Sequence, residues 1–161
     1  MDVLRLNLGV GWLLIVLFPW ICNGSAQQTS SSAKVVEEKL YHLVNEHRKA
    51  KKLLPLILNK TIVKQAQQHS KNMADGKLPF SHKGFDERME MIAKDISYHG
   101  AAENIAVYPD SVRVAESVFQ QWLKSRSHQE NIEGDYDLTG IGAVQDTNGK
   151  WFFTQIFVLH K

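Results

Sequence analysis

Apolar residues recur at helical spacing in the first third of the chain and predict a long helix. Ser31 or Ser32 can cap its start. The run Arg48–Lys52 places positive charge at its end, where the helix dipole favours cations, and we interpret that run as solvated. The apolar stripe consists of Val36, Leu40, Leu43, Val44 and His47.

A second helix is predicted from about Thr61 to the sequence Asp75-Gly76, which is typical of a helix end. A loop follows over residues 79–84, and residues 85–94 predict a short helix. The residues at helical spacing in the second helix are Ile62, Ala66, His69 and Met73.

Residues 100–106 are small for the most part, and we expect them to form a turn. Asp110 or Ser111 can cap another helix, which should stop near Ser125. Its apolar face consists of Ala115, Val118, Phe119 and Trp122.

The period changes in the last part of the chain. Residues 139–145 and Lys150–Leu159 are β-rich runs, and Asn148-Gly149 between them is a hairpin signal. Both faces of the last run hold bulky apolar groups, which predicts a central strand covered on both sides. Helices followed by an antiparallel hairpin predict an α+β fold with helices packed on a sheet.

The N-terminus has the pattern of a secretory signal peptide over residues 1–26. The run Leu6–Cys22 is uncharged, and Gly24 and Ala26 stand at −3 and −1 of a cut before Gln27. The alternative is an uncleaved anchor, but the apolar run is short for a spanning helix. We therefore expect a secreted protein with a flexible lead-in over 27–34, a single domain over 35–161 and no transmembrane segment after cleavage.

Composition narrows the function classes. The chain has 161 residues with 19 Lys and Arg against 17 Asp and Glu, and 43% of its residues are hydrophobic. This balance is that of a globular domain and argues against disorder, collagen and nucleic acid as the main partner. The single cysteine, Cys22, leaves with the signal peptide, so the mature domain must be stabilised by its core without a disulfide.

Three scattered residues are the candidates for chemistry. His82 and His128 are expected in loops, and Glu103 lies among alanines and isoleucine, where a charge needs a partner or a metal, or must be neutralised. Two imidazoles and a carboxylate would make an open Zn²⁺ site. The alternative is a structural cluster in which Glu103 only accepts hydrogen bonds, and spacing alone favours it.

The remaining candidates are weaker. His47 and His69 lie on apolar stripes and are predicted to be hydrogen-bonded core or boundary residues. The mature chain has no Cys and no Gly-x-Ser-x-Gly nucleophile motif. Asn59-Lys-Thr61 is a glycosylation sequon, relevant only in a eukaryotic host.

Several segments, in order, resemble one family over about residues 36–158. Its elements here are Asn45-Glu-His-Arg48, Leu53-Leu-Pro-Leu56, Ala66-Gln-Gln-His-Ser70, Phe80-Ser-His82, Ala102-Glu-Asn-Ile-Ala106, Trp122-x-x-Ser125-x-x-His128 and Phe153-Thr-Gln-Ile-Phe157. This series is similar to the CAP superfamily, or SCP domain, of cysteine-rich secretory, antigen 5 and pathogenesis-related 1 proteins. The match is to its compact, disulfide-free, bacterial-like branch.

The resemblance implies an α–β–α sandwich with a small antiparallel sheet between helical layers. Of the residues that line the family's cavity, His82 and Glu103 are present here at the matching positions. His128 matches the Ser-x-x-His motif of the compact, disulfide-free branch. The implied cleft residues are His82, Glu103, His128, Ser125, Asn104 and Gln155, with His82 and His128 as possible Zn²⁺ ligands. Two family cavity residues, a Glu and a His, are replaced by Ser125 and Phe152.

The function that the resemblance implies is a secreted binding or effector module. Its ligand would be extracellular, such as a lipid, a sterol or a cell-surface component. The alternative is a metal-assisted, peptidase-like hydrolase that uses Glu103 with His82 and His128.

Overall fold

A computed structural model describes residues 24–109 and 111–160. The apolar run of the predicted signal peptide lies outside these residues, so the signal peptide stays a prediction. The first helix, α1, spans Gly24–Ala50 and begins earlier than the caps predicted at Ser31 or Ser32. No glycine or proline occurs between Ser25 and Leu54 to stop it, and the lead-in predicted over 27–34 is helical in the structure.

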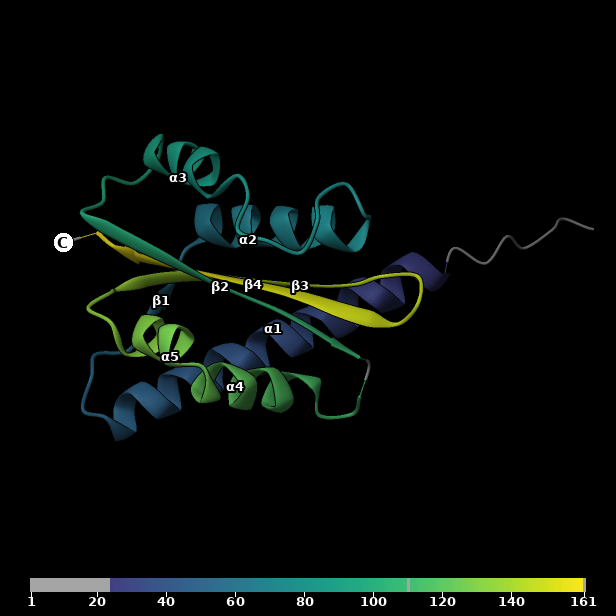
Figure 1. Cartoon of the computed structure of the whole chain (residues 1–161), viewed down its shortest axis with the longest axis horizontal. Coiled ribbons are helices and arrows are strands. Elements are labelled where there is room, and N and C mark those ends of the chain that lie inside the picture. Colours follow the sequence, from purple (N-terminus) through teal and green to yellow (C-terminus); the bar gives the residue numbers. More distant parts are fainter. Residues whose placement is uncertain (1–23, 110, 161) are drawn as a thin grey trace, which may run out of the picture.

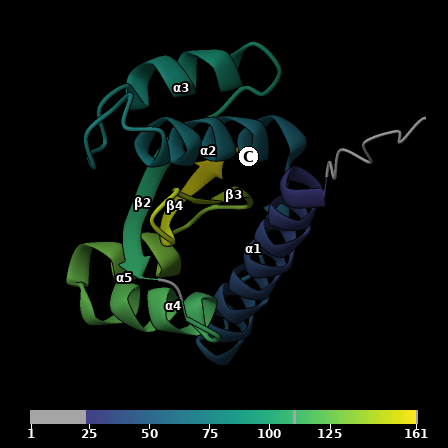
Figure 2. The same cartoon turned by 90° about the vertical axis from the view of Figure 1, so that its right-hand side faces the viewer.

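Helices cover both faces of one sheet (Figure 1). Helices α2 and α3 pack on one face, and α4, α5 and the C-terminal half of α1 pack on the other. The N-terminal half of α1 rises past the sheet edge towards the level of α2 (Figure 2). After α1, the helices are α2 (Lys60–Ala74), α3 (Phe85–Ala93), α4 (Val114–Lys124) and α5 (Arg126–Glu133).

The sheet has four strands in the order β1-β3-β4-β2. It is mixed rather than antiparallel throughout, because the short β1 runs parallel to β3 while β4 is antiparallel to both neighbours. The predicted hairpin between β3 and β4 is confirmed, with Gly149 in the left-handed region at φ 81°. The strands are β1 (Ile57–Leu58), β2 (Gly100–Pro109), β3 (Leu138–Gln145) and β4 (Lys150–Leu159).

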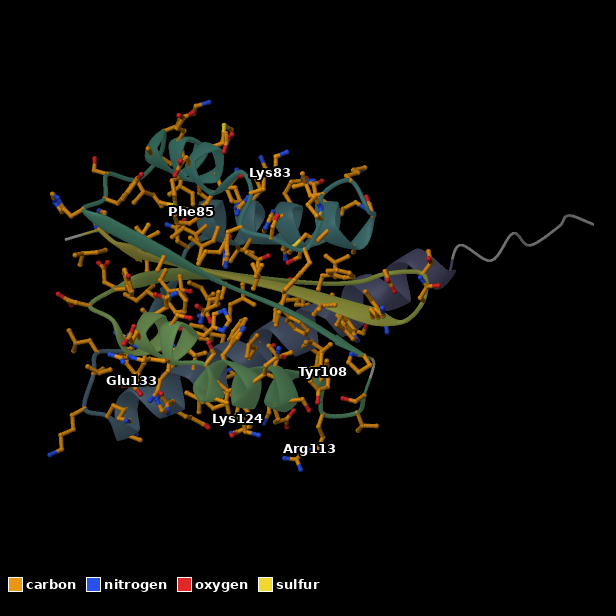
Figure 3. The ribbon with its side chains drawn as sticks, in the orientation of Figure 1. Lys83, Phe85, Tyr108, Arg113, Lys124 and Glu133 are labelled. Carbon is orange, nitrogen blue, oxygen red and sulfur yellow. The ribbon has the colours of Figure 1, made fainter. Side chains whose placement is uncertain are left out.

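The prediction of a doubly covered last strand is confirmed. Alternate residues of β4 enter two separate cores, and side chains fill the space between the sheet and both helical layers (Figure 3). Phe153 and Phe157 pack with α1 and α4, and Ile156 and Val158 pack with α2 and α3. This period-two alternation is what a central strand requires.

The turn predicted over residues 100–106 is wrong: these residues form most of β2. The strand pairs with β4 along its whole length, from Gly100 opposite Leu159 to Pro109 opposite Lys150. The small side chains give no β pattern of their own, and pairing with β4, which lies 41 to 59 residues later in the chain, stabilises the extended conformation.

The solvated helix end predicted over Arg48–Lys52 is also only partly right. Arg48 is 2% exposed. Its guanidinium donates to the carbonyl oxygens of Leu54, Ile132 and Gly134 at 2.8 Å each and to that of Tyr136 at 3.1 Å. Arg48 therefore ties the end of α1 to the loop after α5, while the lysines that follow are exposed.

Helix α2 lies so close to β3 that only glycine fits beneath it. A Cβ at Gly142 would stand 2.3 Å from the Gln67 nitrogen and 2.4 Å from the Ala66 carbonyl carbon. We expect Gly142→Ala to lower the free energy of unfolding by about 1–3 kcal/mol, because backbone atoms must move apart. Urea unfolding measures the change.

The matched control is Gly100→Ala. A Cβ there would meet only the Leu159 Cβ, at an ordinary 3.8 Å. Equal stability loss in the two variants would show that the close approach of α2 to β3 is not what requires glycine.

Within the described ranges, 24–109 and 111–160, no helix is both long enough and apolar enough to cross a membrane.

Candidate functional site

Glu103 sits in the middle of β2, and its side chain is only 2% exposed. His82, in the loop between α2 and α3, places Nδ1 2.9 Å from Glu103 Oε1. His82 and Glu103, two of the three candidate residues, are thus in direct contact. The His82 side chain is 53% exposed, so its ring links the buried carboxylate to solvent.

The main partner of Glu103 is Arg88 on α3. Its Nη2 lies 2.7 Å from both carboxylate oxygens, and its Nε lies 3.0 Å from Oε2. A planar guanidinium matches a carboxylate in this forked way. The buried charge that the sequence left without a partner is thus neutralised by an arginine 15 positions before it.

Arg88 also binds His69, on the inner face of α2. The Arg88 Nη1 donates to His69 Nδ1 at 3.1 Å, so the ring proton lies on Nε2, which donates to the Ser81 carbonyl oxygen at 3.0 Å. Burial first, and then the positive charge of Arg88, lowers the pKa of His69. His69 is the buried, hydrogen-bonded residue that its position on the stripe predicted. We call His69, His82, Arg88 and Glu103 the Glu103 cluster.

Asn104, the next residue in β2, points to the opposite face of the sheet, as alternation in a strand requires. Its Nδ2 donates to the His128 carbonyl oxygen at 3.0 Å, and its Oδ1 accepts from Asn131 Nδ2 at 2.9 Å. Both partners belong to α5, a helix that the sequence did not predict. His128 is therefore helical, not in a loop.

Gln155 lies opposite Asn104 on β4 and is fully buried. Its Nε2 donates to Thr139 Oγ1 at 3.1 Å, but within the described part of the chain its Oε1 has no hydrogen-bond partner, and neither has the buried Nδ1 of His128. Ser125 is the residue between α4 and α5, with its Oγ 3.3 Å from Ser127 Oγ. Of the six predicted cleft residues, His82 and Glu103 share one cluster, and Asn104 and His128 meet through the His128 backbone. Gln155 pairs with Asn104 across the strands and bonds to Thr139, and no hydrogen bond joins Ser125 to either group within the described residues.

Zn²⁺ does not fit these residues. An open zinc site needs three protein ligands with free donor atoms. Both oxygens of Glu103 are already held by Arg88 and His82. Within the described part of the chain, no three His, Cys, Asp or Glu side chains are grouped so that they could hold a metal ion.

Sequence reasoning missed Arg88 and Asn131. A signal for Arg88 was present, because it adjoins the buried Met89 and stands one turn before the buried Ile92 on a short helix. A charge at that position needs a buried counter-charge, as Glu103 does. Asn131 lies on a helix with one buried residue, Ile132, and offered no such signal.

Asn59, the predicted glycosylation residue, is the N-cap of α2. Its Oδ1 accepts from the backbone nitrogen of Thr61 at 2.9 Å and from that of Ile62 at 3.4 Å. Glycosylation stays a prediction for a eukaryotic host.

Stability should fall in mild acid. Burial, and then the proximity of His82, lowers the pKa of His128, as burial and Arg88 lower that of His69. The unfolded chain protonates both imidazoles near pH 6.5 and the folded chain only at lower pH. The unfolded state therefore binds more protons below about pH 7, and each residue removes at most about 1.4 kcal/mol per pH unit. Urea unfolding at pH 7.5 and pH 5 measures the loss.

The double variant His69→Gln, His128→Gln is the control for this pH dependence. It should show a smaller loss of stability between the two pH values than the unmodified chain. An identical loss would assign the acid sensitivity to other groups.

Five helices around a four-stranded mixed sheet, with Glu and His side chains meeting at its β2 edge, define the class of fold. A protein-family model described as the cysteine-rich secretory protein family, CAP, matches residues 41–157. The chain therefore belongs to the CAP family. A comparison with curated protein sequences finds no significant match.

Three of the similar solved structures are bacterial proteins. An outer surface protein of Borrelia burgdorferi is 25% identical, with a TM-score of 0.69 over 80% of this chain and 95% of that one. An extracellular SCP-domain protein of Bacillus anthracis is 24% identical, with a TM-score of 0.70 over 83% of this chain. A cysteine-rich secretory protein of Staphylococcus aureus is 21% identical, with a TM-score of 0.62 over 80%. This chain covers 43% and 39% of the last two proteins.

Proposed function

We propose that this chain is a secreted binding or effector domain and that its Glu103 cluster stabilises the fold instead of catalysing a reaction. The observation that supports this most directly is the state of the Glu103 carboxylate. A general acid or base must reach the proton that it transfers. Here both carboxylate oxygens are bound by Arg88 and His82, and the side chain is 2% exposed.

The ligand proposed is extracellular: a lipid, a sterol or a cell-surface component. The extracellular and outer-surface relatives support this location, and the predicted signal peptide agrees with it. A groove between α1 and α2, described below, offers an apolar lining at the edge of the sheet away from Glu103. Binding sites of this kind combine an apolar surface with a few polar groups.

The second candidate is a hydrolase, which the contact between His82 and Glu103 favours. The two functions differ in what Glu103→Gln does. A hydrolase loses turnover of peptide or ester substrates with the fold intact, whereas a binding domain has no turnover to lose and keeps its ligand affinity.

The test is to secrete the full chain and identify by mass spectrometry both the mature N-terminus and any molecule that co-purifies. A retained extracellular ligand, equally abundant on Glu103→Gln, supports the proposal. Turnover that disappears in Glu103→Gln would replace the binding domain with an enzyme.

A further inference from the structure

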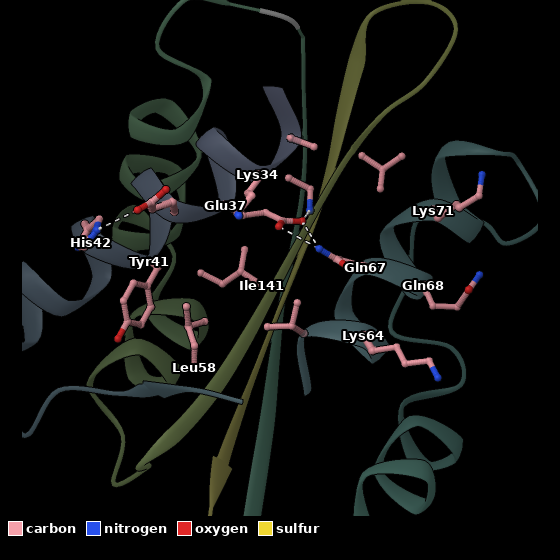
Figure 4. Close-up of a pocket in the computed structure, with 15 residues that line it drawn as sticks. Lys34, Glu37, Tyr41, His42, Leu58, Lys64, Gln67, Gln68, Lys71 and Ile141 are labelled. Carbon is pink, nitrogen blue, oxygen red and sulfur yellow. Dashed lines mark hydrogen bonds and ion pairs between the residues drawn. The ribbon is translucent and has the colours of Figure 1, made fainter. Parts of the chain in front are cut away.

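A groove of about 930 Å³ lies between α1 and α2, along the edge of the sheet opposite to β2 (Figure 4). We call it the α1–α2 groove. Its apolar lining includes Ile141 and Ala143 of β3, Leu58 of β1 and Val63 of α2. Leu58 is 45% exposed, so its side chain offers free apolar surface in the groove. None of the predicted cleft residues lines it.

The backbone edge of β3 is only partly paired in this groove. Strand β1 pairs with Leu138 and Thr139 and with no later residue of β3. The remaining outer edge, residues 140–145, is about 20 Å long at roughly 3.4 Å per residue. An unpaired strand edge is a template for another extended chain.

A side chain takes the place of a strand at one point on this edge. Glu37 of α1 reaches across and accepts a hydrogen bond from the Ala143 backbone nitrogen at 2.9 Å. Gln67 of α2 donates to both Glu37 oxygens at 3.0 Å, so the carboxylate spans the groove (Figure 4). The carboxylate oxygen occupies the position that a peptide carbonyl would take in a β-ladder. Burial raises the pKa of Glu37 in spite of these bonds, so its loss of hydration is only partly offset.

Each side of the groove carries a lysine that forms no ion pair with the described residues, and Glu37 and Glu38 also line the α1 side. Lys34 lines it from α1 and Lys64 from α2, and both are exposed. Among the described residues, neither lysine side chain makes a hydrogen bond or an ion pair. The side chain of Lys71, on the same helix as Lys64, instead forms an ion pair with Asp75 at 3.0 Å. A ligand with negative charges on both sides would complement these lysines.

We propose that the α1–α2 groove binds an extended, acidic peptide segment of a partner protein as an added strand on β3. A peptide carbonyl replaces Glu37 at the Ala143 nitrogen, apolar side chains cover Leu58 and Val63, and acidic side chains pair with Lys34 and Lys64. The inference rests on the proposed binding function and names its ligand class. A fatty acid could use the apolar lining and place its one carboxylate at the Ala143 nitrogen, as Glu37 does. An extended peptide offers a backbone carbonyl at every second residue and can therefore follow the edge of β3 beyond Ala143.

The test starts from a phage-displayed library of random decapeptides selected on the purified chain. The double variant Lys34→Glu, Lys64→Glu serves for counter-selection, and Lys49→Glu, Lys124→Glu is the matched control because those lysines are exposed and lie outside the groove. Enriched sequences should alternate apolar with acidic residues. The best peptide should bind the groove variant at least about tenfold more weakly, as expected for two lost exposed ion pairs, and the control within about twofold.

Two further measurements separate strand addition from other binding. An analogue of the peptide with alternate backbone nitrogens methylated should lose binding, and the Ala143 amide resonance of ¹⁵N-labelled protein should shift on binding the parent peptide. Equal binding of the methylated analogue, or an Ala143 resonance that does not move, overturns the inference.

A fluorescent fatty acid tests the competing ligand. Failure of the library to yield any peptide that discriminates the groove variant overturns strand addition. If the fatty acid then binds saturably and the charge reversal weakens it, the binding-domain proposal stands with an acyl ligand. Turnover dependent on Glu103 would instead overturn the proposed function itself.

Discussion

Arg88→Met is expected to lower the free energy of unfolding by about 3–5 kcal/mol. The substitution keeps a long apolar side chain on α3 but leaves the Glu103 carboxylate, 2% exposed, without its cation. Removing one member of a buried ion pair costs this much because the other charge stays buried and unpaired. It also removes the donor to His69 Nδ1, so a second buried group loses its partner. Urea unfolding at pH 7.5 measures the change.

Two further variants show whether the pairing with Glu103 is the cause. Lys83→Met removes an exposed cation in the loop beside α3 and should cost less than about 0.5 kcal/mol. The double variant Arg88→Met, Glu103→Gln removes both charges and should be more stable than Arg88→Met alone. If the double variant is no more stable than the single one, the loss comes from packing or from His69 and the cluster is not an ion-pair centre.

The sequence shows that the Glu103 carboxylate needs a partner, but it does not show that the partner is Arg88. A carboxylate among small apolar residues must be paired, and that argument needs no fold. Whether that partner is Arg88, a metal ion or an imidazole depends on where α3 lies over β2. No local sequence pattern predicts that position. His82 and Glu103 stand out by their settings, a loop and an apolar stretch, and the family motifs contain both, whereas Arg88 stands outside those motifs.

The fold was predictable where periodicity is local. The stripes of α2 and α4 and the alternation in β4 report burial directly, and Asn59 caps the start of α2. The cap predicted for α4 was wrong at Ser111, because Arg113 occupies the N-cap position and makes no side-chain capping bond, and Asp110 lies outside the described residues. Strand β2 was missed because Gly100, Ala101 and Ala102 have little β propensity and are held by pairing with β4. Helix α5 was missed because it is polar around nearly its whole surface, with Ile132 alone buried.

The β2 and β3 edges of the sheet differ in which polar groups they leave available to a ligand. At the β2 edge, the ionisable side chains of the Glu103 cluster are already bound to one another. At the β3 edge, the Glu37 side chain binds the Ala143 backbone nitrogen, and Lys34 and Lys64 form no ion pair with the described residues. We therefore place the proposed binding site at the β3 edge and not at the cluster that the family motif marks.

Trp122→Ala is the second large effect expected, also about 3–5 kcal/mol in the free energy of unfolding. The Trp122 side chain is fully buried between α4, α1 and the sheet, and its Nε1 donates to the Ile105 carbonyl oxygen at 3.1 Å. The ring also lies 6.4 Å from that of His128, so it supports α5. The loss combines a large cavity with an unpaired carbonyl oxygen, and urea unfolding measures it.

Trp122→Phe separates these two contributions, since it keeps most of the apolar volume and removes only the donor. It should cost about 1–3 kcal/mol, the penalty for a buried acceptor left without a partner. Gln121→Ala, on the exposed side of α4, is the control and should change stability by less than about 0.5 kcal/mol. Because Ile105 lies two residues after Glu103 on β2, the hydrogen bond from Trp122 also holds the strand that carries the cluster. A Trp122→Ala variant as stable as Gln121→Ala would mean that α4 does not pack on β2 through this ring.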